Sequence, residues 1–171
     1  MIISNSNRLV KFFLTYLPII LLFTSVLNEF DFNHLGTKYF SFNFSYILIF
    51  YYSLKRTKSL GYGLIFIAGL FNDVVGGTLI GISSLNFLLI CGFSAYLRNI
   101  TLRPSLIKDW IFFLITISVI NSFSYTLMTF LFGAEMNYFD VIVNTVFTFL
   151  LYFIFSFLFS VFEEKFIGRQ E

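Results

Sequence analysis

Residues 69–85 have the sequence GLFNDVVGGTLIGISSL, and this segment decides how the chain folds. It places the carboxylate of Asp73 in a run from Ser59 to Leu97 that contains no other charged residue. A single helix over that run would be about 58 Å long, far longer than a bilayer's hydrocarbon core is thick. Because Gly76 and Gly77 interrupt the run, the sequence predicts two helices joined by a tight turn.

The composition of the chain indicates its class. Hydrophobic residues make up 58% of the 171 positions, and charged residues make up 12%. A soluble domain is typically about 25% charged. The sequence therefore predicts an all-α integral membrane protein. We attribute the high content of Phe, Ile and Asn to an AT-rich genome.

Apolar runs of nearly spanning length predict six transmembrane helices in a single membrane domain covering residues 1–171. The second and third are shorter than the roughly 20 residues that usually cross a bilayer. The predicted helices cover approximately residues 9–28, 39–54, 59–75, 78–97, 110–132 and 140–162.

The distribution of basic residues predicts the orientation. If the N-terminus is cytoplasmic, 10 of the 11 Lys and Arg residues fall on the inner side, and Lys38 alone falls outside. Lys and Arg accumulate on the cytoplasmic side of membrane proteins. We therefore expect both termini inside, with the loops at residues 29–38 and 133–139 facing outward.

Asp73 is the ionisable residue that most needs an explanation. A charged group at the centre of a membrane helix costs roughly 2.5–3.5 kcal/mol on insertion scales, so it faces a bundle, a cavity or a partner. One role is to accept hydrogen bonds from backbone N–H groups at the Gly76-Gly77 turn, where Asp is common. The other is to face a partner or to relay protons. The residues leave both roles open.

Small and polar residues recur at helical spacing and predict packing faces between helices. On the third predicted helix they are Gly61, Ile65, Ala68, Gly69, Asn72, Asp73 and Gly76. On the fourth they are Gly81, Ser84, Leu88, Cys91, Gly92 and Ala95. The fifth carries Ser118, Asn121, Ser122, Tyr125 and Thr129, and the sixth carries Thr145, Thr148, Tyr152 and Ser156.

Residues suited to catalysis or metal binding are sparse. His34 is the one histidine and falls in an outer loop, and Cys91 is the one cysteine and falls in mid-helix. We find no phosphate-binding loop, nucleophile set or zinc spacing, and we expect no catalytic residue, cofactor, metal or nucleic acid. Nor do the outer loops suggest a convergent polar pocket, so we expect protein partners and no small ligand.

The central segment also resembles a known family. The pattern Gly69-Leu70-x-x-Asp73, with Gly77, Gly81 and Leu85, then Tyr96-Leu97 and a basic loop, is similar to the signature of the rod shape-determining protein MreD family. The chain departs from that signature at Leu79, where the family often has Pro, and at Ser83, where it often has His. The resemblance suggests that Gly69, Asp73, Gly77 and Gly81 have structural or partner-binding roles.

The resemblance implies a non-enzymatic, multi-pass scaffold subunit of the cell-elongation complex in the bacterial inner membrane. Its partners would be an MreC-like protein, MreB filaments, the glycosyltransferase RodA, a penicillin-binding transpeptidase and membrane lipid. The implied fold is similar to the substrate-binding subunit of energy-coupling-factor transporters.

Two other classes remain as alternatives. One is a substrate-binding subunit of such a vitamin-type transporter, although the first predicted helix lacks the Ala-rich face that those subunits use. The other is a proton-relay subunit, which rests on Asp73 alone and would need further buried ionisable partners.

Overall fold

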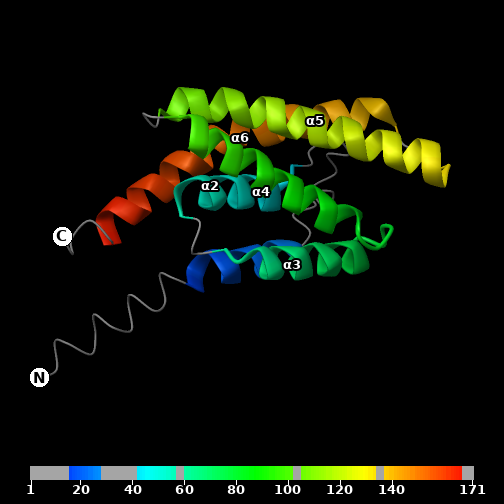
Figure 1. Cartoon of the computed structure of the whole chain (residues 1–171), viewed down its shortest axis with the longest axis horizontal. Helices are drawn as coiled ribbons and strands as arrows, with labels where there is room; N and C mark the ends of the chain where they lie inside the picture. Colours follow the sequence, from blue (N-terminus) through cyan, green and yellow to red (C-terminus); the bar gives the residue numbers. More distant parts are fainter. Residues whose placement is uncertain (1–15, 28–41, 57–59, 102–104, 134–136, 167–171) are drawn as a thin grey trace, which may run out of the picture.

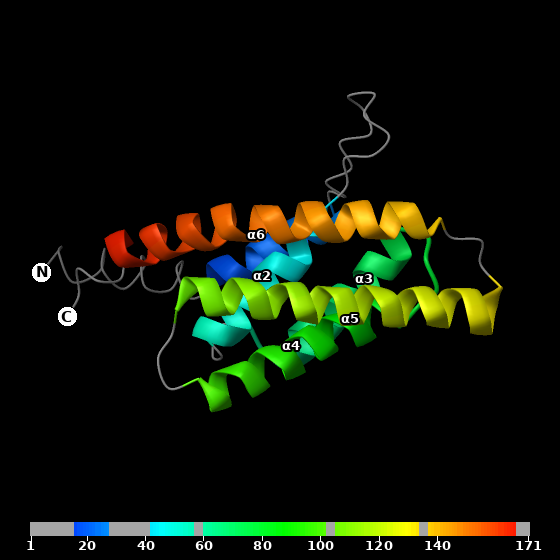
Figure 2. The ribbon, with the colours of Figure 1, turned by 90° about the horizontal axis from the view of Figure 1, so that it is seen from above.

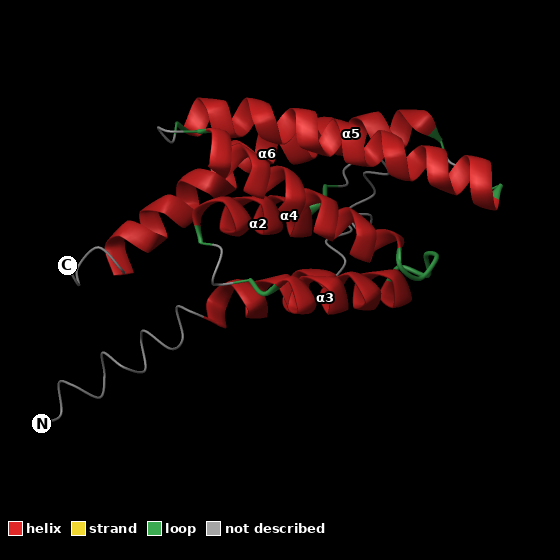
Figure 3. Cartoon of the chain, viewed as in Figure 1, coloured by secondary structure: helices red, strands yellow, loops and turns green. Residues whose placement is uncertain are grey.

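The computed structural model of the protein describes residues 16–27, 42–56, 60–101, 105–133 and 137–166. These residues form helices and connecting turns with no strand among them (Figure 3), which confirms the predicted all-α class. The helices are a first helix at Tyr16–Leu27, α2 (Phe44–Lys55), α3 (Tyr62–Val75), α4 (Ile82–Ile100), α5 (Leu106–Phe132) and α6 (Tyr138–Phe166).

The helices form a bundle with α2 and α4 in its middle. Figure 1 shows the first helix and α3 on one side, α5 and α6 on the other, and α2 and α4 between them. Figure 2 shows α5 and α6 running alongside each other. Aromatic rings pack between the helices of each pair. The ring centroids of Phe23 in the first helix and Phe71 in α3 lie 6.1 Å apart. Those of Trp110 in α5 and Phe149 in α6 lie 4.5 Å apart, with the rings stacked.

Helix α2 is the core of the bundle. Every residue from Ser45 to Leu54 is buried, because the helix is apolar on all sides and neighbours surround it. Phe50 packs against Phe113 and Tyr152, with ring centroids 5.0 and 5.6 Å away. The predicted helix at residues 39–54 begins outside the described residues, and α2 itself begins at Phe44. Its 12 residues rise about 18 Å, less than the bilayer core.

Helices α5 and α6 are long and apolar enough to cross a membrane, by length and composition. Within their apolar windows, 22% and 17% of the residues are buried, so they differ from the buried core helices of soluble proteins. Exposed apolar residues recur at every fourth position of α5, which is one face of a helix. They are Ile107, Ile111, Ile115, Val119 and Phe123. Such a face is suited to contact with lipid tails.

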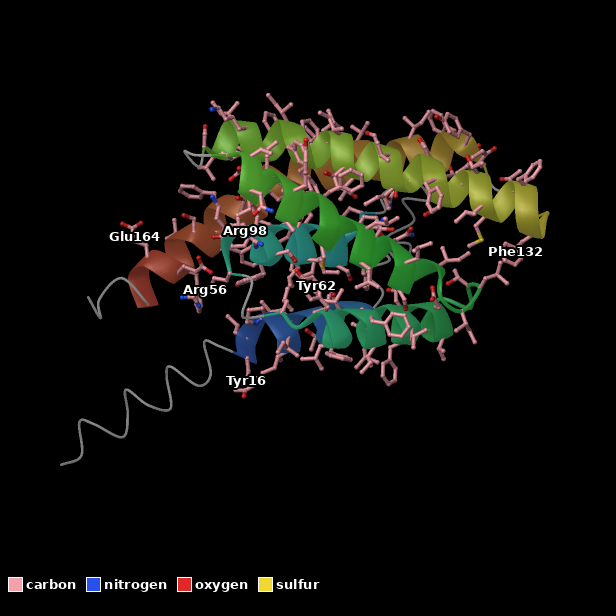
Figure 4. All side chains as sticks on the ribbon, in the orientation of Figure 1. Tyr16, Arg56, Tyr62, Arg98, Phe132 and Glu164 are labelled. Carbon is pink, nitrogen blue, oxygen red and sulfur yellow. The ribbon has the colours of Figure 1, made fainter. Side chains whose placement is uncertain are left out.

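One end of the bundle, here called the charged end, carries the ion pairs. Figure 4 shows Arg56, Arg98 and Glu164 at this end and Phe132 at the opposite end. The contacts there are Lys55 to Asp109 at 2.9 Å, Arg56 to Glu163 at 3.6 Å, and Arg98 to the backbone carbonyl of Ser53 at 3.0 Å. They tie the end of α2 to α5, α6 and α4, and the sequence pattern did not predict them.

Candidate functional site

The carboxylate of Asp73 lies in the turn between α3 and α4 and is fully buried. Its Oδ1 atom accepts hydrogen bonds from the Thr78 hydroxyl and the Ser83 backbone N–H, both at 3.0 Å. Its Oδ2 atom accepts one from the Gly81 backbone N–H at 2.7 Å. The first N–H groups of a helix lack partners within that helix, so the Asp73 carboxylate caps the N-terminus of α4.

Two glycines allow the backbone to make this turn. Gly77 has φ +62° and Gly81 has φ +105°, conformations that other residues rarely adopt. The Thr78 N–H donates to the Asp73 carbonyl at 3.0 Å, which is the bond of a Schellman turn with Gly77 at its left-handed position. The turn is longer than predicted, because α4 begins at Ile82 and not at residue 78.

At Gly69 the backbones of α3 and α4 approach closely. A Cβ atom on Gly69 would lie 2.6 Å from the Ser84 backbone nitrogen and closer still to its Cα. Ser84 is fully buried, and its hydroxyl donates to the Phe66 carbonyl at 2.9 Å. Glycine is therefore required at position 69 by close backbone packing.

The predicted packing faces are only partly buried. Ile65, Ala68, Gly69 and Asp73 of the α3 face are buried. The prediction was wrong for Gly61, Gly76 and Gly92, which are exposed. An added Cβ at Gly61 or Gly92 would meet nothing within 4 Å. Gly61 and Gly76 flank the two ends of α3, and Gly92 lies in the middle of α4.

The predicted faces of α5 and α6 supply contacts inside the bundle, except at Ser122 and Thr129 of α5, which are exposed. The Asn121 side chain donates to the Thr145 hydroxyl at 2.8 Å, which links the two helices. Thr148, Tyr152 and Ser156 are buried. Tyr125 lies edge-on to Tyr138, with ring centroids 5.1 Å apart.

A cavity of about 540 Å³ opens at the end of the bundle opposite the charged end, here called the cavity end. Its walls come from the starts of α2, α4 and α6 and from the C-terminal parts of α3 and α5. The described residues contain seven asparagines, and six of them line the cavity. They are Asn43, Asn72, Asn86, Asn121, Asn137 and Asn144.

This cavity corrects the expectation that the chain has no convergent polar pocket. The predicted outer loops carry few polar residues, whereas the cavity is lined mainly by residues of the helices. Asparagines that looked like a compositional habit come together from five segments of the chain. Asn43, Asn72 and Asn144 lie near one end of a predicted helix, whereas Asn86 and Asn121 lie near the middle of theirs. Their sequence positions alone therefore do not locate the cavity.

Hydrogen bonds between the polar side chains hold the cavity walls in place. Asn86 is central, because its side chain donates to the Tyr46 hydroxyl at 3.1 Å and accepts from the Ser124 hydroxyl at 2.7 Å. The Asn72 side chain donates to the Ser83 hydroxyl at 3.0 Å. The Asn43 side chain donates to Asn144 Oδ1, also at 3.0 Å. These bonds join α2, α3, α4, α5 and α6 around the cavity.

In the described ranges, no three His, Cys, Asp or Glu side chains come together as metal ligands would. Cys91 is buried in α4, with its sulfur 3.4 Å from the Ser53 hydroxyl. His34 lies outside the described residues.

Comparison with known proteins identifies the family. The profile of the rod shape-determining protein MreD family matches residues 7–169. Comparisons with curated proteins and with solved structures give no match, so the similarity to transporter subunits stays a prediction. The family match includes all six helices and the turn that Asp73 closes, and the chain therefore belongs to the rod shape-determining protein MreD family.

Proposed function

We propose that the chain is a non-catalytic scaffold subunit of the cell-elongation complex, which links cytoskeletal and peptidoglycan-synthesis proteins to control cell shape. The observation that carries this proposal is the family match over residues 7–169. The proposed partners are an MreC-like protein, MreB filaments, RodA and a penicillin-binding transpeptidase. The vitamin-transporter alternative receives no support from the family match, and we do not propose it.

We further propose a multi-pass arrangement in the inner membrane, with six spans and both termini in the cytoplasm. Its support is the separation of charge between the two ends of the bundle. Lys55, Arg56 and Arg98 lie at the charged end, and the described residues that line the cavity include no Lys or Arg. Because basic residues accumulate inside, the charged end faces the cytoplasm and the cavity end faces outward.

The four predicted site residues would act within the scaffold by holding α3, α4 and the turn between them as one rigid unit. Gly69 allows α3 and α4 to touch, Gly77 and Gly81 shape the turn, and Asp73 caps α4. The buried carboxylate already accepts three hydrogen bonds, which favours a structural role over contact with a partner.

Co-purification of the full-length chain from gently solubilised membranes tests this function. We expect an MreC-like protein to be retained, and to be absent when an unrelated membrane protein of similar size is used as bait. Retention of an ATPase pair in place of any elongation protein would contradict the proposal.

A further inference from the structure

The cavity has the size and position of a ligand site. Its volume of about 540 Å³ falls within the roughly 300–1,000 Å³ range of small-molecule pockets. It lies at the end of the bundle where α2, α4 and α6 begin, and the proposed orientation makes that end the outer one. The scaffold role proposed above does not explain why so many polar side chains converge there.

The cavity walls combine polar and apolar side chains and are almost uncharged. Among the described lining residues, Asp140 is the one charged side chain, and it lies exposed at the start of α6. The described lining residues include no Lys or Arg that could bind an anion. The single exposed carboxylate of Asp140 is a weak site for a cation. Asparagine side chains both donate and accept hydrogen bonds, so the wall suits a neutral ligand that does both.

Several polar atoms of the wall have hydrogen-bonding capacity left over. The amide nitrogens of Asn72 and Asn121 donate to Ser83 and Thr145, which fixes how these two side chains are turned. Within the described part of the chain, no hydrogen bond reaches their Oδ1 atoms or the Tyr125 hydroxyl. The lining residues thus keep two amide oxygens and one hydroxyl available for further hydrogen bonds.

Aromatic rings also line the cavity beside these polar groups. Tyr46 and Phe87 lie edge to face, with ring centroids 5.9 Å apart, and Tyr125 contributes a third ring. Flat apolar rings next to fixed amides suit the C–H faces and hydroxyl edges of a sugar ring. A purely apolar ligand would leave the amides without partners, which is unfavourable.

We propose that this cavity binds a neutral, hydroxyl-rich molecule of one or two sugar rings, either free or as the head group of a membrane lipid. The inference goes beyond the scaffold role and does not depend on it. A ligand held here would contact α2 to α6 together and would fix the positions of their ends.

Binding is tested on the full-length chain in lipid nanodiscs. The probes are N-acetylglucosamine in solution, a glucosyl-diacylglycerol incorporated in the nanodisc, and glucuronate as the charged control. Binding of the soluble sugar identifies a free ligand, and binding of the glycolipid alone identifies a head group. Both results support the proposal. Failure of both neutral probes at millimolar concentration, or equally strong binding of glucuronate, would overturn it.

Matched variants locate the binding. Tyr125→Phe removes one hydroxyl and keeps the ring, so affinity should fall about fivefold. Asn121→Leu should reduce it more, and it leaves Thr145 bonded to the Val141 carbonyl at 2.7 Å. The controls are Tyr62→Phe and Asn99→Leu, which lie on the exposed surface outside the cavity wall. Thermal unfolding verifies that all four fold.

The variants also decide the proposal independently of the scaffold function. A loss confined to Tyr125→Phe and Asn121→Leu supports the cavity as the site. An equal loss in the control variants, or no loss in the two wall variants, would overturn it. If neither sugar probe binds and a segment of an MreC-like protein occupies the cavity instead, the proposal is also overturned. The scaffold function would stand in that case.

Discussion

The Asp73 side chain accepts a hydrogen bond from the Gly81 backbone N–H at 2.7 Å, across the turn between α3 and α4. This contact joins the end of one helix to the start of the next. Thr78 and Ser83, which also donate to Asp73, line the cavity. The buried carboxylate therefore holds both the hairpin and one wall of the cavity in place.

Substitution of Asp73 by Asn should destabilise the chain, because both carboxylate oxygens accept hydrogen bonds. Asn keeps one oxygen and turns an NH₂ group toward a donor. We expect the free energy of unfolding to fall by about 1–3 kcal/mol. Asp73→Leu loses all three bonds and should lower membrane abundance further. Thermal unfolding of the purified chain and quantitative immunoblots of membranes measure both effects.

The same pair of variants separates the two roles of Asp73. If Asp73→Asn folds normally but rounds the cells and weakens co-purification, the carboxylate faces a partner. Normal stability of Asp73→Leu would contradict the capping role. From the sequence alone, Asn would be tolerated as a cap, and the use of both oxygens changes that expectation.

Substitution of Gly69 by Ala should force α3 and α4 apart, because the added Cβ meets the Ser84 backbone. Overpacking of this kind costs about 1–3 kcal/mol. Gly63 is the matched control on the same helix, since a Cβ there would meet nothing within 4 Å. Gly63→Ala should stabilise the helix by up to about 1 kcal/mol. Equal thermal stability of the two variants would show that the helices do not touch at Gly69.

The ion pair between Lys55 and Asp109 should contribute to stability, because the Asp109 side chain is 3% exposed. Removal of one partner from a buried pair usually costs about 3–5 kcal/mol, and the 28% exposure of Lys55 lowers our expectation to about 2 kcal/mol. Denaturation of Lys55→Met measures it. The double variant with Asp109→Leu should recover most of the loss, and a double variant less stable than Lys55→Met would contradict the pairing.

The orientation can be tested with reporter fusions. Fusions after Lys58, after Pro104 and at Glu171 should report the cytoplasm, because the basic residues gather on that side. Fusions near His34 and Glu135 should report the outer side. An outward-facing C-terminus would contradict the six-span arrangement.

Local sequence patterns were enough to predict the hairpin. Glycines at 76 and 77 mark the end of α3, and small residues around Gly69 indicate that the two helices touch. Both features depend on residues close together in the chain. Burial of α2 was not predicted, because its length and hydropathy resemble those of a short span, and neighbours far away in sequence surround it.

The cavity and the ion pairs depend on contacts between distant residues, which periodicity does not show. Asn43 and Asn144 meet across 101 positions of sequence, and Asn86 meets Ser124 across 38. Each asparagine alone looks like an ordinary polar residue in a helix or beside one. Only the assembled helices bring the asparagines together around one cavity.

Cell shape after depletion of the chain tests the central claim most directly. In the host cell, depletion should convert rods to spheres, and re-expression of the wild-type chain or of Gly63→Ala should restore rods. Gly69→Leu, which cannot close the hairpin, should fail to do so. Depleted cells that keep their rod shape and normal growth would contradict the account.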